Sequence, residues 1–111
     1  MPSCFGGFIS TSANKEDHVS MGAYAARKCR DIVANTEEVI AIELLCAAQA
    51  IDLFTNVKAG DGTLAAYEII RTKVDYMKED RLLSTDIAKV KQLLEEGSIV
   101  KAVEETIGKL Y

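Results

Sequence analysis

The residues best suited to chemistry in this 111-residue chain are three consecutive ionisable side chains, Glu16, Asp17 and His18. Two carboxylates and an imidazole can supply a general acid, a general base or metal ligands. Against this, neighbours in a helix point about 100° apart, and acidic residues are common at helix starts, where they face the positive end of the dipole. A plain helix start, with Asn14 as its cap, is therefore the stronger interpretation of these residues alone.

A metal site is not expected. His18 is the sole histidine of the sequence and has no HxxxH or ExxH partner, so the ligands are too few. The cysteines Cys4, Cys29 and Cys46 are far apart and form no CxxC pair, which predicts reduced thiols rather than disulfides or zinc ligands.

Other polar residues are better explained by structure than by chemistry. Glu43 lies amid apolar residues. A buried ion-pair partner is the stronger interpretation of this residue, and a functional group is the alternative. A basic cluster is typical of a solvated or inter-subunit face: Arg27, Lys28 and Arg30. The four tyrosines fall at helical spacings, as packing residues with a wet hydroxyl do: Tyr24, Tyr67, Tyr76 and Tyr111.

The composition excludes several classes of partner. The net charge is −4 and the basic residues are interleaved with acidic ones, which argues against nucleic acid. The most apolar run, residues 39–54, contains three polar residues and is shorter than the roughly 20 residues of a membrane span. The first residues lack the pattern of a signal or transit peptide. We therefore expect a cytoplasmic protein with no membrane partner.

The elements that must position these residues are all helices. Apolar residues recur at spacings of three, four and seven across one long helix, about residues 17–53, with a conceivable kink near Asn35. Three shorter helices are predicted to follow over residues 64–80 after the cap Thr63, 86–96 opened by Ser84 or Thr85, and 99–111 after the C-cap Gly97. We predict a single all-α segment covering residues 1–111, without strands.

The apolar faces of the three shorter helices predict which residues point inward. The predicted inward residues are Leu64, Tyr67, Ile70, Val74 and Met77 in the first, Ile87, Val90, Leu93 and Leu94 in the second, and Val100, Val103 and Ile107 in the third.

The long helix is too long and too apolar for a small domain. At about 1.5 Å per residue it would reach roughly 50 Å, whereas a compact domain of this size is only about 35 Å across. Its second half is apolar nearly all the way round, so it must be covered on most sides. We expect burial against other copies of the chain or against missing parts of a larger protein.

The sequence also resembles a known family. The run TSANKEDHVSMGAYAARK, followed by VIAIELLCAAQAID, is similar to the C-terminal part of the histidine ammonia-lyases, in the aromatic amino acid lyase family. The similarity continues through LAAYEIIR, KEDRLLSTDI and EEGSIVKAVEE and so covers nearly the whole chain. It implies that the chain is a C-terminal fragment of such a lyase.

The resemblance implies a mostly helical homotetramer built around long helices, with active sites assembled from several subunits. The family eliminates ammonia from L-histidine to give urocanate, in the pathway of histidine catabolism. It uses a methylidene-imidazolone electrophile that forms from an internal Ala-Ser-Gly. This chain contains no Ala-Ser-Gly, so we expect no cofactor within it and no lyase activity from the chain alone.

By the same resemblance, the family's active-site glutamate falls on Glu16, with roles in substrate positioning and proton transfer. The preceding residue is usually Gln in the family and is Lys15 here. Its ammonium, a candidate substrate-binding group, would lower the pKa of Glu16 if the two side chains met, or could point to solvent. The family's other active-site residues belong to segments outside this chain.

Two functional hypotheses remain open. In the first, the chain is part of a lyase and supplies oligomer-core helices and one active-site carboxylate, with the missing N-terminal part or further copies as partners. In the second, it is a non-catalytic helical assembly module derived from the lyases. A small metal-dependent hydrolase using Glu16, Asp17 and His18 is disfavoured by its few ligands.

Overall fold

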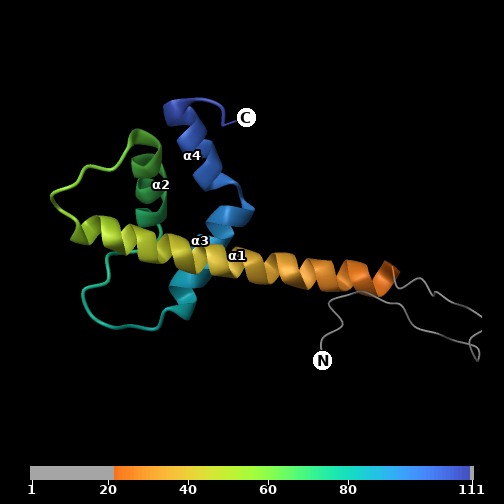
Figure 1. Cartoon of the computed structure of the whole chain (residues 1–111). Coiled ribbons are helices and arrows are strands. Elements are labelled where there is room, and N and C mark those ends of the chain that lie inside the picture. The colour runs from red at the N-terminus through yellow and green to blue at the C-terminus, as the bar shows by residue number, and fades with distance from the viewer. Residues whose placement is uncertain (1–21, 111) are drawn as a thin grey trace, which may run out of the picture. The chain divides into compact units, whose positions relative to one another are not determined.

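The computed structural model describes residues 22–110 of the chain, and every regular element within them is a helix. They are α1 (Gly22–Leu53), α2 (Asp61–Arg71), α3 (Ser84–Glu95) and α4 (Ser98–Ile107) (Figure 1). The predicted all-α fold, with one long helix followed by three shorter ones, is confirmed. The helix α1 runs through Asn35 without a break, and the first residues predicted for it, 17–21, lie outside the described range.

The chain divides into two compact units, residues 1–35 and residues 36–111, and each is taken here by itself. In the first unit the structure describes residues 22–35 of α1. Two β-branched apolar side chains there are about half exposed, Ile32 at 54% and Val33 at 51%. This part of the helix therefore presents apolar surface to water.

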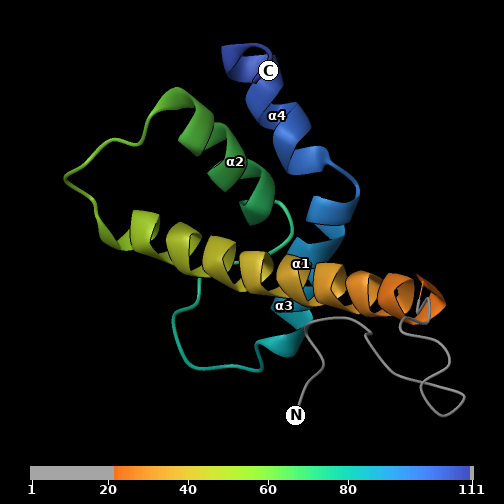
Figure 2. The same ribbon diagram turned by 45° about the vertical axis from the view of Figure 1, so that its right-hand side comes forward.

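The second unit contains the hydrophobic core. Its α2 and α3 both pack against α4 (Figure 2). α1 contributes two small residues to the core, Ala41 and Ala48, which lie seven residues apart and so share one helix face. The buried core residues are Ala41, Ala48, Ile70, Val74, Val90, Leu93 and Ile99.

The helix α2 begins earlier and ends earlier than its pattern predicts. Gly60, with extended backbone, precedes it, and Thr63 lies within it rather than at its cap. It approaches α4 closely, because a Cβ on Gly62 would lie 3.2 Å from Cδ1 of Ile107. It ends at Arg71, and the Thr72 hydroxyl then donates to the carbonyl of Ile69.

The prediction that this helix continues to residue 80 is wrong. Val74 is buried and Met77 is partly buried, as predicted, but both lie in the irregular segment 72–83. The apolar residues of this segment are spaced as in a helix and do pack into the core, but the backbone that carries them is not helical. The side chains that fix this path are described with the site below.

The last two helices agree closely with the sequence pattern. α3 begins at Ser84, so the predicted cap at Ser84 or Thr85 is wrong: both residues lie within the helix, Leu83 precedes it, and no side chain caps it. Its Val90 and Leu93 are buried, and Ile87 and Leu94 pack against the core, as predicted. Gly97 has φ +72°, the left-handed conformation that favours glycine after a helix, so the predicted C-cap is confirmed.

Two of the three inward residues predicted for α4 are wrong. Ile99 is buried, whereas Val100 is 47% exposed and Ile107 is 53% exposed. The adjacent residues Ile99 and Val100 are both β-branched and apolar, and the packing of α4 against α2 and α3 decides which of them is buried. The predicted helical run 108–110 is also wrong, because Gly108 ends α4 with φ +90°.

Candidate functional site

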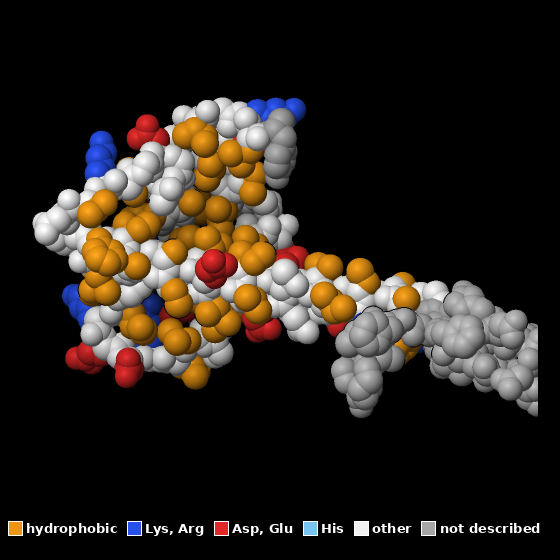
Figure 3. Space-filling model, viewed as in Figure 1, with side chains coloured by type: hydrophobic (Ala, Val, Ile, Leu, Met, Phe, Trp, Pro, Cys, Tyr) orange, Lys and Arg blue, Asp and Glu red, His pale blue; other side chains and the backbone are white. Residues whose placement is uncertain are grey.

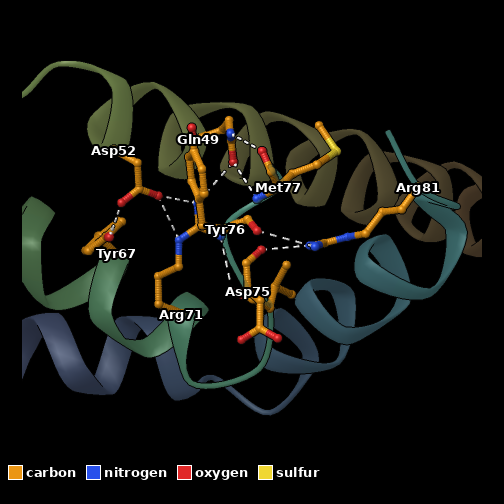
Figure 4. A network of polar contacts seen from close by, with 9 residues as sticks. Gln49, Asp52, Tyr67, Arg71, Asp75, Tyr76, Met77 and Arg81 are labelled. Carbon is orange, nitrogen blue, oxygen red and sulfur yellow. Dashed lines mark hydrogen bonds and ion pairs between the residues drawn. The ribbon is translucent and has the colours of Figure 1, made fainter. Parts of the chain in front are cut away.

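The residues that the sequence nominates for chemistry lie outside the described range. Lys15, Glu16, Asp17 and His18 all precede residue 22. The described part of the second unit instead contains a polar network (Figure 4) and an apolar cleft, and neither is predicted above.

The network is centred on Asp52, in the last turn of α1. One carboxylate oxygen, Oδ1, accepts a hydrogen bond from the Tyr67 hydroxyl. The other oxygen, Oδ2, accepts from Nε of Arg71 at 3.0 Å and forms an ion pair with Nη2. Tyr67 and Arg71 are four residues apart on α2, so one face of that helix presents both donors to α1. The Arg71 guanidinium carbon also lies 5.6 Å from the centre of the Tyr67 ring, within the range of a cation–π contact.

This pairing moves the pKa values of both Asp52 and Tyr67 further from neutral pH. Burial alone would raise the pKa of Asp52, but the hydrogen bonds from Tyr67 and Arg71 and the positive guanidinium outweigh it and lower that pKa. The hydrogen bond to Asp52, together with burial, raises the pKa of Tyr67. Asp52 is thus held as a carboxylate and Tyr67 as a neutral phenol, which suits an anchor between helices better than a general acid or base.

Gln49, one turn before Asp52, holds the irregular segment in place. Its amide nitrogen donates to the Met77 carbonyl at 3.0 Å, and its amide oxygen accepts from the Met77 backbone N–H at 3.2 Å. The side-chain amide therefore pairs with the backbone of Met77 as a neighbouring strand would. Arg71 reinforces this by donating to the carbonyl of Val74 at 3.2 Å.

Arg81 anchors the other end of the irregular segment. Its Nε donates to Oδ2 of Asp86 at 2.8 Å, and Asp86 is buried at the start of α3. Its Nη2 donates to the carbonyl of Asp75 at 2.7 Å, and Nη1 reaches the carbonyl of Tyr76 at 3.5 Å. Because these backbone groups are satisfied by side chains, the segment needs no helical hydrogen bonds.

An apolar cleft of about 310 Å³ lies beside these anchors. α1 forms one side of it, and the segment 72–83 with the start of α3 forms the other. Its apolar lining consists of Ile42, Leu45, Cys46, Ala50, Leu53, Val74, Met77, Leu83 and Ile87. Its polar lining consists of Gln49, Arg71, Asp75, Arg81 and Asp86.

The remaining nominated residues in the described range carry no catalytic arrangement. Glu43 is exposed, so its interpretation as a buried ion-pair partner is wrong. Cys29 and Cys46 are free thiols, as expected. Within residues 22–110 no cluster of His, Cys, Asp and Glu could hold a metal ion. No helix in that range has the length and apolarity to cross a membrane.

The network had a weak signal in the sequence. Gln49 and Asp52 interrupt an apolar run at a spacing of three, and Tyr67 and Arg71 share a face of the next helix at a spacing of four. Such polar pairs on facing helices predict a buried polar contact, although the spacing alone does not say which residues meet.

Comparison with known proteins identifies the family. A family model described as aromatic amino acid lyase matches residues 2–72 of the chain, a range that includes Glu16, Asp52 and Arg71. The chain belongs to the aromatic amino acid lyase family. Among this family's members, the histidine ammonia-lyase of Natranaerobius thermophilus is 53% identical over 92% of the chain, and that of Gloeobacter violaceus is 49% identical over the same share.

A solved lyase structure has the same fold. The crystal structure of histidine ammonia-lyase from Trypanosoma cruzi superposes with a TM-score of 0.78, at 42% sequence identity, over 89% of this chain. The chain spans only 20% of the length of each of these three relatives. The family's fold is therefore shared over this part.

Proposed function

We propose that the chain acts as the C-terminal part of a histidine ammonia-lyase and takes part in the elimination of ammonia from L-histidine to give urocanate. The observation that carries the proposal is the identity of about half of all residues, over 92% of the chain, with relatives named histidine ammonia-lyase. The run from Ser12 to Gly22, in which the resemblance is most specific, supports the same substrate class.

In this proposal α1 is an assembly helix. Within the second unit it exposes a row of β-branched side chains that a soluble helix rarely leaves in water: Val39 at 62%, Ile40 at 39% and Ile42 at 43%. Contact with further copies of the chain, or with the rest of the lyase, would cover this row.

Glu16 is the catalytic residue that the proposal assigns, by its place in the lyase motif. It would lie beside the substrate and take part in positioning and proton transfer. An ammonium close to a carboxylate lowers the carboxylate's pKa and makes it a weaker base, so Lys15 would tune Glu16 if the two side chains meet. The sequence holds no Ala-Ser-Gly. The electrophile would thus come from a part of the lyase outside this chain.

Co-expression with the complementary part of a lyase tests the proposal. The chain is produced together with the four fifths of the Natranaerobius thermophilus lyase that it does not match, and urocanate formation from L-histidine is followed by absorbance. We expect product from the pair and none from the chain alone. A stable complex without product would refute the proposal and favour the non-catalytic assembly module.

Substitution of Glu16 separates its role from that of its neighbour. In the active pair, Glu16→Gln should lower kcat by about 10²–10⁴, the usual contribution of a positioned acid or base. The matched control Asp17→Asn removes a charge one residue away and should leave kcat within about threefold. Equal losses in both variants would contradict the assignment of Glu16.

A further inference from the structure

The apolar cleft of the second unit has the shape of a groove along a helix. Its lining residues on α1 include Ile42, Leu45, Gln49 and Leu53, whose spacings of three and four place them on one helix face. From Ile42 to Leu53 the helix rises about 17 Å at 1.5 Å per residue. Three turns of a second helix could lie along such a groove.

The opposite wall of the cleft is held in position before anything binds. Gln49 makes two hydrogen bonds to the backbone of Met77, and Arg81 donates to the carbonyl of Asp75 while paired with Asp86. These contacts fix the irregular segment beside α1. A partner therefore would not have to order it, which lowers the cost of binding.

The charges around the cleft select an uncharged occupant. Arg71 is paired with Asp52, and Arg81 is paired with Asp86. Asp75, which also lines the cleft, is exposed to solvent. An anionic partner would have to break one of the two pairs, and a charge of either sign would lose its hydration in the apolar surroundings.

The apolar lining is itself incompletely covered. Ile42 is 43% exposed, Leu53 is 64% exposed and Leu83 is 46% exposed. In Figure 3 hydrophobic side chains gather along α1 in this unit and on the surface beside it. A contiguous apolar surface of this kind marks a contact site.

We propose that this cleft is a preformed docking groove for an uncharged, apolar helix from the part of the lyase outside this chain. We assign the occupant to the rest of the lyase because this chain spans only 20% of each relative's length, so most of such a protein lies outside it. The identity of the partner rests on the proposed function, whereas the groove and its apolar selectivity rest on the geometry above.

Co-purification of the chain with the complementary four fifths of the Natranaerobius thermophilus lyase tests the groove. Ile42→Glu and Leu83→Glu place a charge in the cleft, and each should lower the retained partner by about tenfold or more. Val100→Glu is the matched control, because Val100 is 47% exposed and does not line the cleft. It should change retention less than twofold. Equal retention by all three variants, or no complex with the unsubstituted chain, would overturn the inference.

The thiol of Cys46, which lines the cleft and is exposed, gives a second measurement that needs no disruptive substitution. In a Cys4→Ser, Cys29→Ser background, labelling of Cys46 by a thiol reagent should slow about tenfold or more in the complex. If instead labelling of the chain alone slowed equally as its own concentration rose, the occupant would be a second copy and the inference would be wrong.

Failure of docking and failure of the proposed function give different results. A complex that depends on the cleft but forms no urocanate would refute the proposed function and leave the groove standing. Urocanate formation that is insensitive to Ile42→Glu and Leu83→Glu would refute the groove alone. Circular dichroism of each variant chain verifies that the helices are retained.

Discussion

Asp52→Asn is the perturbation that the structure defines most sharply. The substitution keeps the shape of the side chain but removes the charge that Arg71 faces, and it places an amide where one carboxylate oxygen accepts a hydrogen bond. A hydrogen bond to a charged group contributes about 1.5–3 kcal/mol. The side chains of Arg71 and Asp52 are 15% and 21% exposed, so solvent screening reduces this value. We expect a loss of about 2 kcal/mol in the free energy of unfolding at pH 7.

The pH dependence of this loss follows from the direction of the pKa shift. The pKa of Asp52 is lowered from its ordinary 3.8 in the folded chain. Its stabilising contribution is therefore fully present above the unfolded pKa and is lost as the pH falls through the lower folded value. The difference between Asp52→Asn and the unsubstituted chain should be constant from about pH 5 to 8 and shrink at more acidic pH.

Urea or thermal unfolding followed by circular dichroism measures both effects. For a unit of this size, a loss of about 2 kcal/mol corresponds to roughly 8–16 °C in Tm. Asp80→Asn, which removes an exposed aspartate from the irregular segment, is the matched control and should change Tm by less than about 3 °C. A loss of stability that persisted undiminished at acidic pH would show that the charge of Asp52 is not its cause.

Two further substitutions test how the irregular segment and the α3–α4 turn are fixed. Gln49→Ala removes both hydrogen bonds to the backbone of Met77 and should cost about 1–3 kcal/mol. Amide exchange at Met77 should become faster, and unchanged exchange would show that Gln49 does not fix the segment. Gly97→Ala forces a Cβ into the left-handed region at φ +72°, where nothing lies within 4 Å to clash with it. The cost should be the backbone term of about 1–2 kcal/mol. Gly97→Asn should cost less, because asparagine tolerates this conformation, and urea unfolding in which it cost as much as alanine would contradict the argument.

The sequence predicts the helices where local signals agree. The start of α3 is predicted to within two residues by its apolar spacing, although Leu83 and not Ser84 or Thr85 is its N-cap. The turn at Gly97 is predicted because glycine favours the left-handed conformation after a helix. The length of α1 is predicted because nothing between residues 23 and 53 breaks a helix. These features depend on the local chain alone.

The errors arise where distant residues decide the structure. Val74 and Met77 keep helical spacing after Arg71, but Gln49 and Arg81 hold that segment in an irregular path. Burial of Ile99 rather than Val100 depends on the rotation that α4 adopts against α2 and α3. No local pattern contains this information.

In the candidate site, too, local sequence signals are predictable and contacts between distant residues are not. The motif nominates Glu16 through resemblance to a family, and its position lies outside the described residues. Spacing alone could not predict the cleft or which residues pair in the Asp52 network, because each joins α1 to residues about 15 to 45 positions away. Glu43 was expected to be buried because its sequence neighbours are apolar, yet they line other sides of α1 and leave it exposed.

A covalent chimera tests the central claim most directly, because it removes docking between separate chains as a variable. The stretch of the Natranaerobius thermophilus lyase that aligns with this chain is replaced by the 111 residues, and urocanate formation from L-histidine is measured. The account predicts an active chimera that loses about 10²–10⁴ in kcat on Glu16→Gln. A folded chimera that forms no urocanate would contradict it.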